Sequence, residues 1–395
     1  MADRHIYCVH DKLYNLAKFV DKHPGGANVF SNLKSHTDIT PLIYTYHKDV
    51  SLIRDILLKY DISANANHLS QVTYRKDYNY DKYVELKTLV YKEISIKELP
   101  LYWSFAETLY NLGGFVLYVG IWAHCNRLVI TSRAVSAWWF VLLAAINIGH
   151  CALFFHETSH YCGFKNQHLN TLVSHIAVAP VLTTEEWKWD HNYLHHGFTN
   201  TGFDVDFNGH QLTLRHSANH PHRFQHRFQH IYAWVLMCLG GLSGQIDSIK
   251  HERWNIFLFF YIVYWFGIKN SAIFYFLTGF LFLVTAQLSH IQPECVRGEY
   301  TDFLENQVMS TMNYKTDNIV CRLMCFGLDI QIEHHLFPNI PHSTLRQIQH
   351  IVRDYCRRNG IPYREKANVF EMLKSYWWHL YEMGIAKNDS HFVKN

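Results

Sequence analysis

Long stretches of the chain lack the charged side chains that punctuate an ordinary soluble helix. Residues 108–126 carry no charge, and residues 134–155 form a second uncharged run. Between residues 254 and 293 the only charged side chain is Lys269, near the middle, which predicts a helical hairpin that turns at 269–271. A helix of about 20 apolar residues crosses the roughly 30 Å hydrocarbon core of a bilayer. The pattern therefore predicts four membrane-spanning helices in two pairs.

The rest of the chain is more polar, and four crossings would leave it mostly on one side of the membrane. Residues 1 to about 70 are typical of a small soluble unit of helical fragments and turns, followed by a polar, Tyr- and Lys-rich lead-in. Two further uncharged runs, 169–184 and 231–246, are too short to span and are expected to lie at the interface or re-enter. An excess of Lys and Arg beside the large polar regions favours a cytosolic position for them.

Composition narrows the class of protein without deciding it. The 395 residues have a net charge of +3, which gives no reason to expect nucleic-acid binding, and an apolar fraction of 49%, which argues against disorder. The nine cysteines include no CxxC pair, and the chain opens with the polar sequence MADRHIYCVHDK. Reduced thiols are therefore expected rather than disulfides. The unusual number is 29 histidines, because His is the commonest metal ligand.

Histidines gather in three clusters at the predicted cytosolic side. The sequence HETSH follows the second predicted span, WKWDHNYLHH lies in the next loop, and QIEHH lies beyond the fourth span, whose end carries a further histidine. Residues four apart share a face of an α-helix, so the first two clusters are each expected to aim two imidazoles at one place. The candidate metal ligands are His156, His160, His191, His195, His196, His290, Gln331, His334 and His335.

Eight imidazoles exceed what one metal ion needs, so the clusters predict two metal ions. A structural zinc site would favour thiolates and use four ligands. The alternative is that these are solvated histidines of polar loops. Asp204 and Asp206 are candidates to orient the ligand imidazoles, or are solvated loop residues. Another run, with histidines at 216, 220, 222, 226 and 230, is interpreted as a membrane-interfacial stretch that faces lipid headgroups.

The N-terminal unit carries a second metal signature. His23 is followed by Pro24-Gly25-Gly26, and His47 comes 24 residues later. A tight turn without Cβ atoms lets backbone lie close to a flat ligand. Two axial imidazoles would saturate a haem iron and make it an electron carrier. The alternative for the HPGG sequence alone is an ordinary loop turn.

Together these motifs resemble a known family. The first 70 residues resemble a cytochrome b5 domain, with His23 and His47 as its haem ligands, and the remainder resembles the membrane fatty acyl desaturases. The fusion resembles the front-end class, in which the third histidine box begins with Gln, as QIEHH does here. The sequences NTGFDVD, RFQHIYAW, QLSHIQPE and GIPY also match, so the likeness covers nearly the whole chain.

Two positions depart from the family pattern. Glu157 occupies a position in the first box where Asp is common, and three residues separate His191 from His195 where two are common. The longer spacing improves an i, i+4 alignment on an α-helix but leaves the ligand geometry of this box less defined.

The resemblance implies a fold and a domain organisation. We expect an N-terminal α+β cytochrome b5-like domain fused to an all-α polytopic membrane domain with four transmembrane helices and a cytosolic His-rich cap. The boundaries are residues 1–75 for the haem domain, 76–97 for a linker and 98–395 for the desaturase domain. The chain is expected in the endoplasmic reticulum membrane, with both termini and the active site cytosolic.

The resemblance also implies the chemistry. Heme b would pass single electrons from an NAD(P)H-dependent cytochrome b5 reductase to two Fe ions, which with O2 would insert a cis double bond into an unsaturated fatty acyl chain, toward its carboxyl end. The acyl carrier, CoA or phospholipid, and the carbon position attacked stay open. Rival functions are a Δ8-type sphingoid-base desaturase, a lipid-chain hydroxylase, and a membrane cytochrome that only relays electrons.

Overall fold

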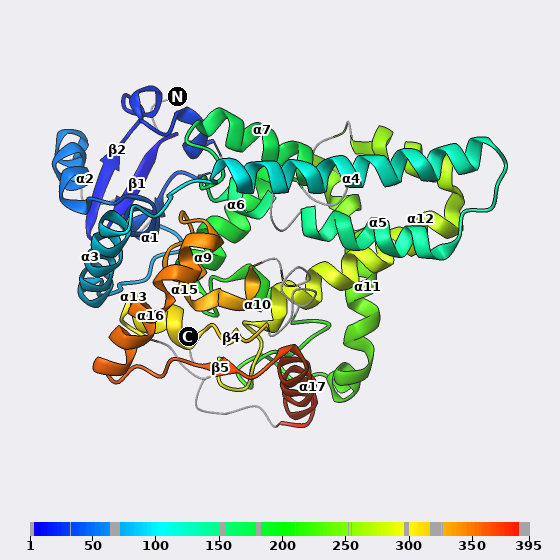
Figure 1. Ribbon diagram of the computed structural model, residues 1–395. Coiled ribbons are helices and arrows are strands. Elements are labelled where there is room, and N and C mark those ends of the chain that lie inside the picture. Colours follow the sequence, from blue (N-terminus) through cyan, green and yellow to red (C-terminus); the bar gives the residue numbers. More distant parts are fainter. Residues whose placement is uncertain are drawn as a thin grey trace.

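The structure is a computed structural model that describes most of the chain and is mainly helical (Figure 1). It describes residues 4–31, 33–63, 72–150, 155–178, 183–209, 211–251, 253, 255–295, 300–316, 325 and 327–386. The seven cysteines in these ranges are free thiols, as expected from their spacing.

A small α+β unit forms the N-terminal part. Strands β1 (Ile6–Val9) and β2 (Lys12–Asn15) make an antiparallel hairpin, and β3 (Thr37–Asp38) pairs with β1 in parallel to give the order β2-β1-β3. His10 turns the hairpin with a φ of 53°. Helices α1 (Thr40–Tyr46) and α2 (Val50–Leu57) complete the unit.

Helix α3 (Asp81–Ile96) joins this unit to the rest and lies within the predicted linking segment. Its buried side chains include Tyr83, Leu86, Val90 and Ile94, at the three- and four-residue spacing of one helical face. That face packs against α16 (His342–Arg358). One hydrophobic core continues from the N-terminal sheet through α3 into the histidine-bearing part of the chain.

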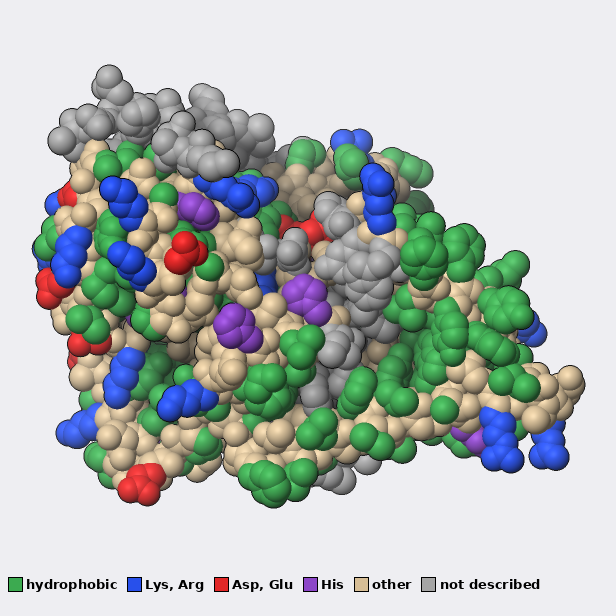
Figure 2. Space-filling view, turned by 90° about the horizontal axis from the view of Figure 1, so that it is seen from above, with side chains coloured by type: hydrophobic (Ala, Val, Ile, Leu, Met, Phe, Trp, Pro, Cys, Tyr) green, Lys and Arg blue, Asp and Glu red, His purple; other side chains and the backbone are tan. Residues whose placement is uncertain are grey.

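Apolar helices project away from this mixed body on one side (Figure 1). They are α4 (Phe105–Ile130), α5 (Ala137–His150) and α12 (Asn255–Leu288). Of the helices described, α4 and α12 are long and apolar enough to cross a membrane, and α5 contains a shorter apolar stretch. Figure 2 shows hydrophobic side chains covering this projection, with Lys and Arg at its far end. Most of the other charged side chains on that face lie over the opposite half, with some Lys or Arg near its upper middle.

Helix α12 is two helices joined at a break. Gly267 has φ 73° and ψ 161°, a backbone conformation open to glycine and strained for other residues. The hairpin expected between residues 254 and 293 is therefore present as a broken helix, and its break lies two residues before the predicted turn at 269–271. The break lies at Gly267 because glycine alone adopts these angles without strain.

The predicted short piece at 231–246 is the middle of a longer helix, α11 (Gln229–His251). This helix packs closely along α12, where Gly241 meets Gly279 backbone to backbone. A Cβ on Gly241 would overlap the carbonyl oxygen of Tyr275, so alanine there would force the helices apart. Helix α17 (Val369–Ile385) packs against the start of α11.

The run of histidines at 216–230 does not form a headgroup-facing surface, and that interpretation is wrong. His216, His220 and His226 are buried. Nε2 of His220 lies 3.0 Å from Oδ1 of Asn208, and Nε2 of His222 lies 2.8 Å from the carbonyl oxygen of Gly384 at the end of α17. Each of these two imidazoles thus uses a ring nitrogen for a polar contact inside the protein. The exposed side chains of this segment include those of Phe224 and Phe228 instead.

Short elements complete the histidine-bearing region. They are α6 (Glu157–Ser159), α7 (Gln167–Val178), α8 (Thr184–Trp187), η6 (Lys188–His195), α9 (His196–Phe198), α10 (Val205–Asn208), η7 (Phe224–Phe228), α13 (Phe303–Met309), β4 (Asn313–Tyr314), η8 (Leu328–Ile330), α15 (Gln331–Leu336) and β5 (Glu365–Lys366). The N-terminal unit adds the 3₁₀ turns η1 (Val20–Lys22), η2 (Ala27–Phe30) and η3 (Leu58–Tyr60).

Candidate metal centre

The structure brings all nine candidate ligands of the desaturase-like region to one buried place. The first box lies around α6, the second on η6 and α9, His290 just beyond α12, and the third box on α15. All nine side chains are buried, and the most accessible of them, that of His191, is 8% exposed. The solvated-loop alternative is therefore excluded for these residues.

Five imidazoles form the first group. They belong to His156, His160, His191, His196 and His334. Nε2 of His191 lies 3.1 Å from Nε2 of His156 and 3.2 Å from Nε2 of His196. Nε2 of His334 is 3.2 Å from that of His196. The Nε2 atoms thus point at a common centre from three boxes.

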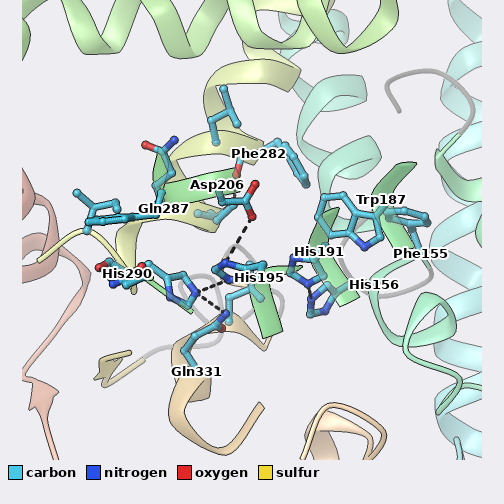
Figure 3. Close-up of a pocket in the computed structure, with 17 residues that line it drawn as sticks. Phe155, His156, Trp187, His191, His195, Asp206, Phe282, Gln287, His290 and Gln331 are labelled. Carbon is cyan, nitrogen blue, oxygen red and sulfur yellow. Dashed lines mark hydrogen bonds and ion pairs between the residues drawn. The ribbon is translucent and has the colours of Figure 1, made fainter. Parts of the chain in front are cut away.

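Three imidazoles and an amide form the second group. His195, His290 and His335 have ligand atoms within 4.8 Å of one another. Nε2 of His290 lies 3.3 Å from Nε2 of His195 and 3.1 Å from the side-chain nitrogen of Gln331 (Figure 3). This group lies directly beside the first, because His191 and His195 also approach within 4.8 Å.

The second box is a π-helix rather than an α-helix. Residues Lys188–His195 are π-helical, and the backbone N–H of His196 donates to the carbonyl of His191, five residues earlier. A π-turn holds one more residue than an α-turn. His191 and His196 therefore belong to the first group and His195 to the second. His191 and His195 nevertheless lie within 4.8 Å of one another, so the expectation that they point to one place agrees with the structure. The extra residue between these two histidines is accommodated by the π-turn.

The spacings fit metal ions. Ligand atoms about 2.1 Å from one ion and at right angles to each other are about 3 Å apart. The Nε2–Nε2 distances of 3.1 to 3.3 Å match this value. Nε2 of His160, Nε2 of His335 and Oε1 of Gln331 are buried without a hydrogen-bond partner. Such atoms are costly to bury unless something binds them, so each group could hold one ion.

The pKa shifts of His156, His191 and His334 suit metal ligation, whereas that of His195 opposes it. Burial, together with neighbouring histidines, holds the pKa of His156, His191 and His334 well below the ordinary value, so these rings are neutral. Burial also opposes protonation of His195, but the carboxylates of Asp204 and Asp206 outweigh it and raise its pKa. Neutral imidazole is the form that binds metal.

Outer hydrogen bonds orient several of the rings. Nδ1 of His195 lies 3.0 Å from Oδ2 of Asp204, which is fully buried and also accepts from the backbone N–H of Asn200. Nδ1 of His335 lies 3.0 Å from Oε1 of Gln307. Partners of this kind fix the tautomer and direction of a ligand histidine.

Sequence reasoning missed a buried pair behind the first group. The carboxylate of Glu157 accepts from the backbone N–H of His342 at 2.7 Å and lies 2.6 Å from its Nδ1, and it also accepts from the indole of Trp103. The His342 ring stacks on that of His334 with centroids 5.1 Å apart. His342 lies outside the three boxes, so no local spacing marks it, and only the tertiary fold shows the contact.

An apolar cavity of about 100 Å³ opens onto both groups. Phe282, Leu283 and Ala286 of α12 line one side, and Phe155 and Trp187 line another (Figure 3). Its metal-facing wall consists of His156, His191, His195, His290 and Gln331. The Trp187 ring stacks on His191 with centroids 4.3 Å apart. The cavity can therefore hold hydrocarbon next to the metal ligands.

A second, larger cavity of about 370 Å³ lies in the N-terminal unit. His23 and His47 face each other across it, with ring centroids 5.9 Å apart and planes at 89°. With metal–nitrogen bonds of about 2 Å, two rings on opposite sides of one ion have centroids about 6 Å apart. Much of the lining is apolar, from residues such as Val29, Leu42 and Ile53. The two histidines could thus hold a flat, metal-bearing cofactor.

The HPGG turn shapes one side of this cavity. The backbone N–H of Gly25 lies against Nδ1 of His23, with the two nitrogens 3.1 Å apart, so the turn holds the His23 ring in place. A Cβ on Gly25 would lie 3.0 Å from the His23 ring, and Gly26 has a φ of 83°, so both glycines serve the turn. Burial, with His23 nearby, lowers the pKa of His47 to about 4 and keeps that ring neutral.

Fold and site together define a helical protein with projecting apolar helices and a buried, histidine-rich centre suited to metal ions. The fatty acid desaturase family model matches residues 134–367, which contain every residue of that centre, and the chain belongs to this family. The resemblance inferred from the histidine boxes is confirmed at this level.

Curated relatives agree with the family. The chain is 26% identical to the sn-1 linoleoyl-lipid 6-desaturase of Synechocystis sp. over 67% of this chain and 89% of that protein. It is 24% identical to the acyl-lipid (8-3)-desaturase of Physcomitrium patens over 95% of this chain and 87% of the relative. The Delta(8)-fatty-acid desaturase 2 of Arabidopsis thaliana is also 24% identical, over 92% and 87%. Fatty acid desaturases are oxidoreductases.

Proposed function

We propose that this chain is an oxygen-dependent front-end fatty acyl desaturase. It inserts a cis double bond between an existing double bond and the carboxyl end of an acyl chain. The observation that carries the proposal is the pair of imidazole groups whose Nε2 atoms converge beside an apolar cavity. The names of relatives that match most of the chain support acyl chains as the substrate class.

Two Fe ions occupy the imidazole groups in this proposal, one in each. Once bound, they supply the oxidising power of O2, which the removal of hydrogen from an unactivated methylene pair requires and no acid or base side chain provides. The protein orients the ligands through Asp204 and Gln307 and keeps bulk water from a centre that is buried throughout. Gln331 lies beside His290 as a further ligand, direct or through water.

The cavity beside α12 positions the substrate. Phe282 and Leu283 contact the acyl chain, while the imidazoles of His191 and His195 face the carbons to be oxidised. Apolar contact along the chain holds particular methylenes at the metal centre, and this placement selects the position of the new double bond.

The N-terminal unit is a cytochrome b5-like electron carrier in this proposal, with heme b between His23 and His47. His23 and His47 would together hold its iron, and a heme held by two imidazoles would supply single-electron exchange rather than O2 binding. The ring distance of 5.9 Å and the glycine turn beside His23 support this assignment. An NAD(P)H-dependent cytochrome b5 reductase would return each electron to the heme.

The apolar projection is the membrane part. Helices α4, α5 and the two halves of α12 cross the bilayer as two pairs, and the histidine centre lies at the cytosolic boundary of the endoplasmic reticulum membrane. The hydrophobic cover of the projection and the charged side chains at its far end support this arrangement (Figure 2).

Expression in yeast with one unsaturated fatty acid fed at a time tests the proposal. Gas chromatography of acyl chains and long-chain bases should show a new cis double bond on the carboxyl side of the existing one. A strain that expresses the His334→Ala variant is the background control. Unsaturated long-chain bases or hydroxylated chains as the sole new products would contradict the proposal.

A further inference from the structure

The two cofactor regions meet at one side chain. Tyr46 ends α1 and lines the N-terminal cavity together with His23 and His47. Its hydroxyl lies 2.7 Å from Nδ1 of His160, a member of the five-imidazole group. Tyr46 also precedes His47 directly in the chain. A covalent and hydrogen-bonded connection therefore runs from one histidine of the cavity to one of the metal centre.

The catalytic part of the chain forms one wall of the N-terminal cavity. Tyr161, Lys188 and Asn192 line the cavity although they belong to the region of the first two histidine boxes. The side-chain amide of Asn192 donates to the carbonyl oxygen of Ser159 at 2.7 Å, next to His160. The back of the metal centre is thus the wall of the neighbouring cavity.

Contacts around Tyr46 fix this arrangement. The hydroxyl of Tyr193 donates to the carbonyl oxygen of Asp38 at 2.9 Å, and the amide of Asn339 donates to the carbonyl oxygen of Tyr46 at 3.4 Å. Gly197 lies against Pro41, where an added Cβ would be 3.4 Å from the proline ring. The N-terminal unit is therefore packed onto the metal centre through several elements.

The free nitrogen of His160 completes the connection. Nε2 of this ring is buried and has no hydrogen-bond partner, and it belongs to the group that could hold an ion. When Nε2 binds metal, Nδ1–H donates to the phenol oxygen of Tyr46, because a neutral imidazole carries one proton. The other ring nitrogen of a ligand histidine is the usual position of an orienting partner.

We propose that Tyr46 conducts electrons from the N-terminal cofactor to the metal centre through His160. The proposal rests on the proposed function. Each transfer oxidises one ferrous heme iron to ferric and reduces one ferric ion of the centre to ferrous. The reductase then restores the heme by one electron. Tyr46 stays a neutral phenol, and no bond in it forms or breaks; its hydrogen bond shortens the gap that the electron must tunnel across.

The test measures heme oxidation in the full-length protein. The heme is reduced without oxygen and mixed with oxygenated buffer and acyl substrate, and the Soret band reports how fast ferrous heme becomes ferric. Tyr46→Phe removes only the hydroxyl and should slow this step severalfold, because the hydrogen bond to Nδ1 of His160 is replaced by a gap in the path. The heme spectrum, midpoint potential and iron content should stay as in wild type.

Tyr44→Phe is the matched control. Tyr44 lies two residues earlier on the same helix, but its hydroxyl lies 3.1 Å from Nε2 of His10 within the N-terminal unit. Its loss should leave the rate of heme oxidation unchanged. An equal slowing in both variants would show a general effect on α1 and overturn the assignment to Tyr46.

A second measurement separates conduction from orientation of His160. Dithionite with a small mediator reduces the metal centre directly, and single-turnover product is then measured. Tyr46→Phe should form as much product as wild type, because the heme is bypassed. If Tyr46→Phe forms less product than wild type under these conditions, Tyr46 only orients His160. If heme oxidation in Tyr46→Phe is as fast as in wild type, Tyr46 is not on the electron path. If wild type itself lacks heme or makes no unsaturated product, the proposed function fails instead.

Discussion

The metal centre and the N-terminal cavity use histidine in different ways. The centre draws eight imidazoles from segments between residues 156 and 335 and packs them in two groups with Nε2 atoms about 3 Å apart. The cavity uses His23 and His47, only 24 residues apart, on opposite sides of a space of about 370 Å³. The centre is suited to single ions held by many elements, and the cavity to one flat group held at two points. The predictions below test this difference.

Loss of one ligand from the crowded centre should have the largest effect. His334→Ala should lower desaturation by more than about 100-fold, because it removes a ligand itself. Loss of a residue that only hydrogen-bonds to a ligand typically costs less than this. Iron content per protein should fall while the heme spectrum stays intact. His175→Ala is the control, since Nδ1 of His175 lies 2.8 Å from the carbonyl of Thr171 on its own helix, α7. Full product formation by His334→Ala would exclude the third box from the site.

Loss of one histidine from the cavity should give the converse pattern. His47→Ala should abolish the b5-type absorption spectrum, because the cavity would lose one of the two histidines that line it. Iron in the histidine centre should remain, measured by metal analysis after heme extraction. Activity supported by NAD(P)H should fall strongly. A spectrum identical to that of wild type would show that His47 is not an axial ligand.

An outer partner of the centre should matter less than a ligand. Asp204→Asn leaves an oxygen near His195 but removes the charge that favours its orientation, so activity or iron affinity should fall about 10- to 100-fold. The control is Asp247→Asn on α11, where the carboxylate pairs with Lys250 at the surface. Equal activity of the two variants would assign Asp204 to the stability of its loop alone.

The last prediction concerns the stability of the N-terminal unit rather than activity. Burial raises the pKa of Asp38 to about 6, although Thr40 donates to it. The folded chain keeps this proton to higher pH than the unfolded chain, so stability should fall as pH rises from about 4 to about 6 and then level off. The full shift corresponds to about 3 kcal/mol. In thermal unfolding, Asp38→Asn should show a smaller fall across this range; the same fall in both proteins would remove Asp38 as its source.

Local spacing was enough to select eight of the nine candidate ligands, because each box is short and its members lie within one or two turns. His290 was selected instead from its place at the end of the fourth predicted span. Local spacing was not enough to divide the ligands between two groups, because the extra residue between His191 and His195 does not by itself reveal that the backbone there is a π-helix. The contacts of His342 with Glu157 and of Tyr46 with His160 join residues 185 and 114 positions apart. Such contacts depend on how whole helices and loops pack together, so local sequence patterns do not predict them.

Hydropathy predicted that apolar helices exist, but it located their ends and breaks less accurately. Uncharged runs identify α4 and α12 because few polar residues fit a lipid-facing helix. The break in α12 follows the backbone freedom of Gly267 rather than the position of Lys269. Histidines 216, 220 and 226 resemble a surface stretch by composition, but α17, more than 140 residues later, helps to cover them.

The packing of Pro41 on Gly197 and the hydrogen bond from Tyr193 to Asp38 hold the N-terminal unit next to the metal centre. Its effective concentration there is therefore constant. In the proposed function, the supply of electrons would then be an intramolecular process, independent of how much soluble carrier a cell makes. Under that proposal, a growth state poor in free cytochrome would leave desaturation by this chain running, while desaturases that rely on a diffusing donor slow down.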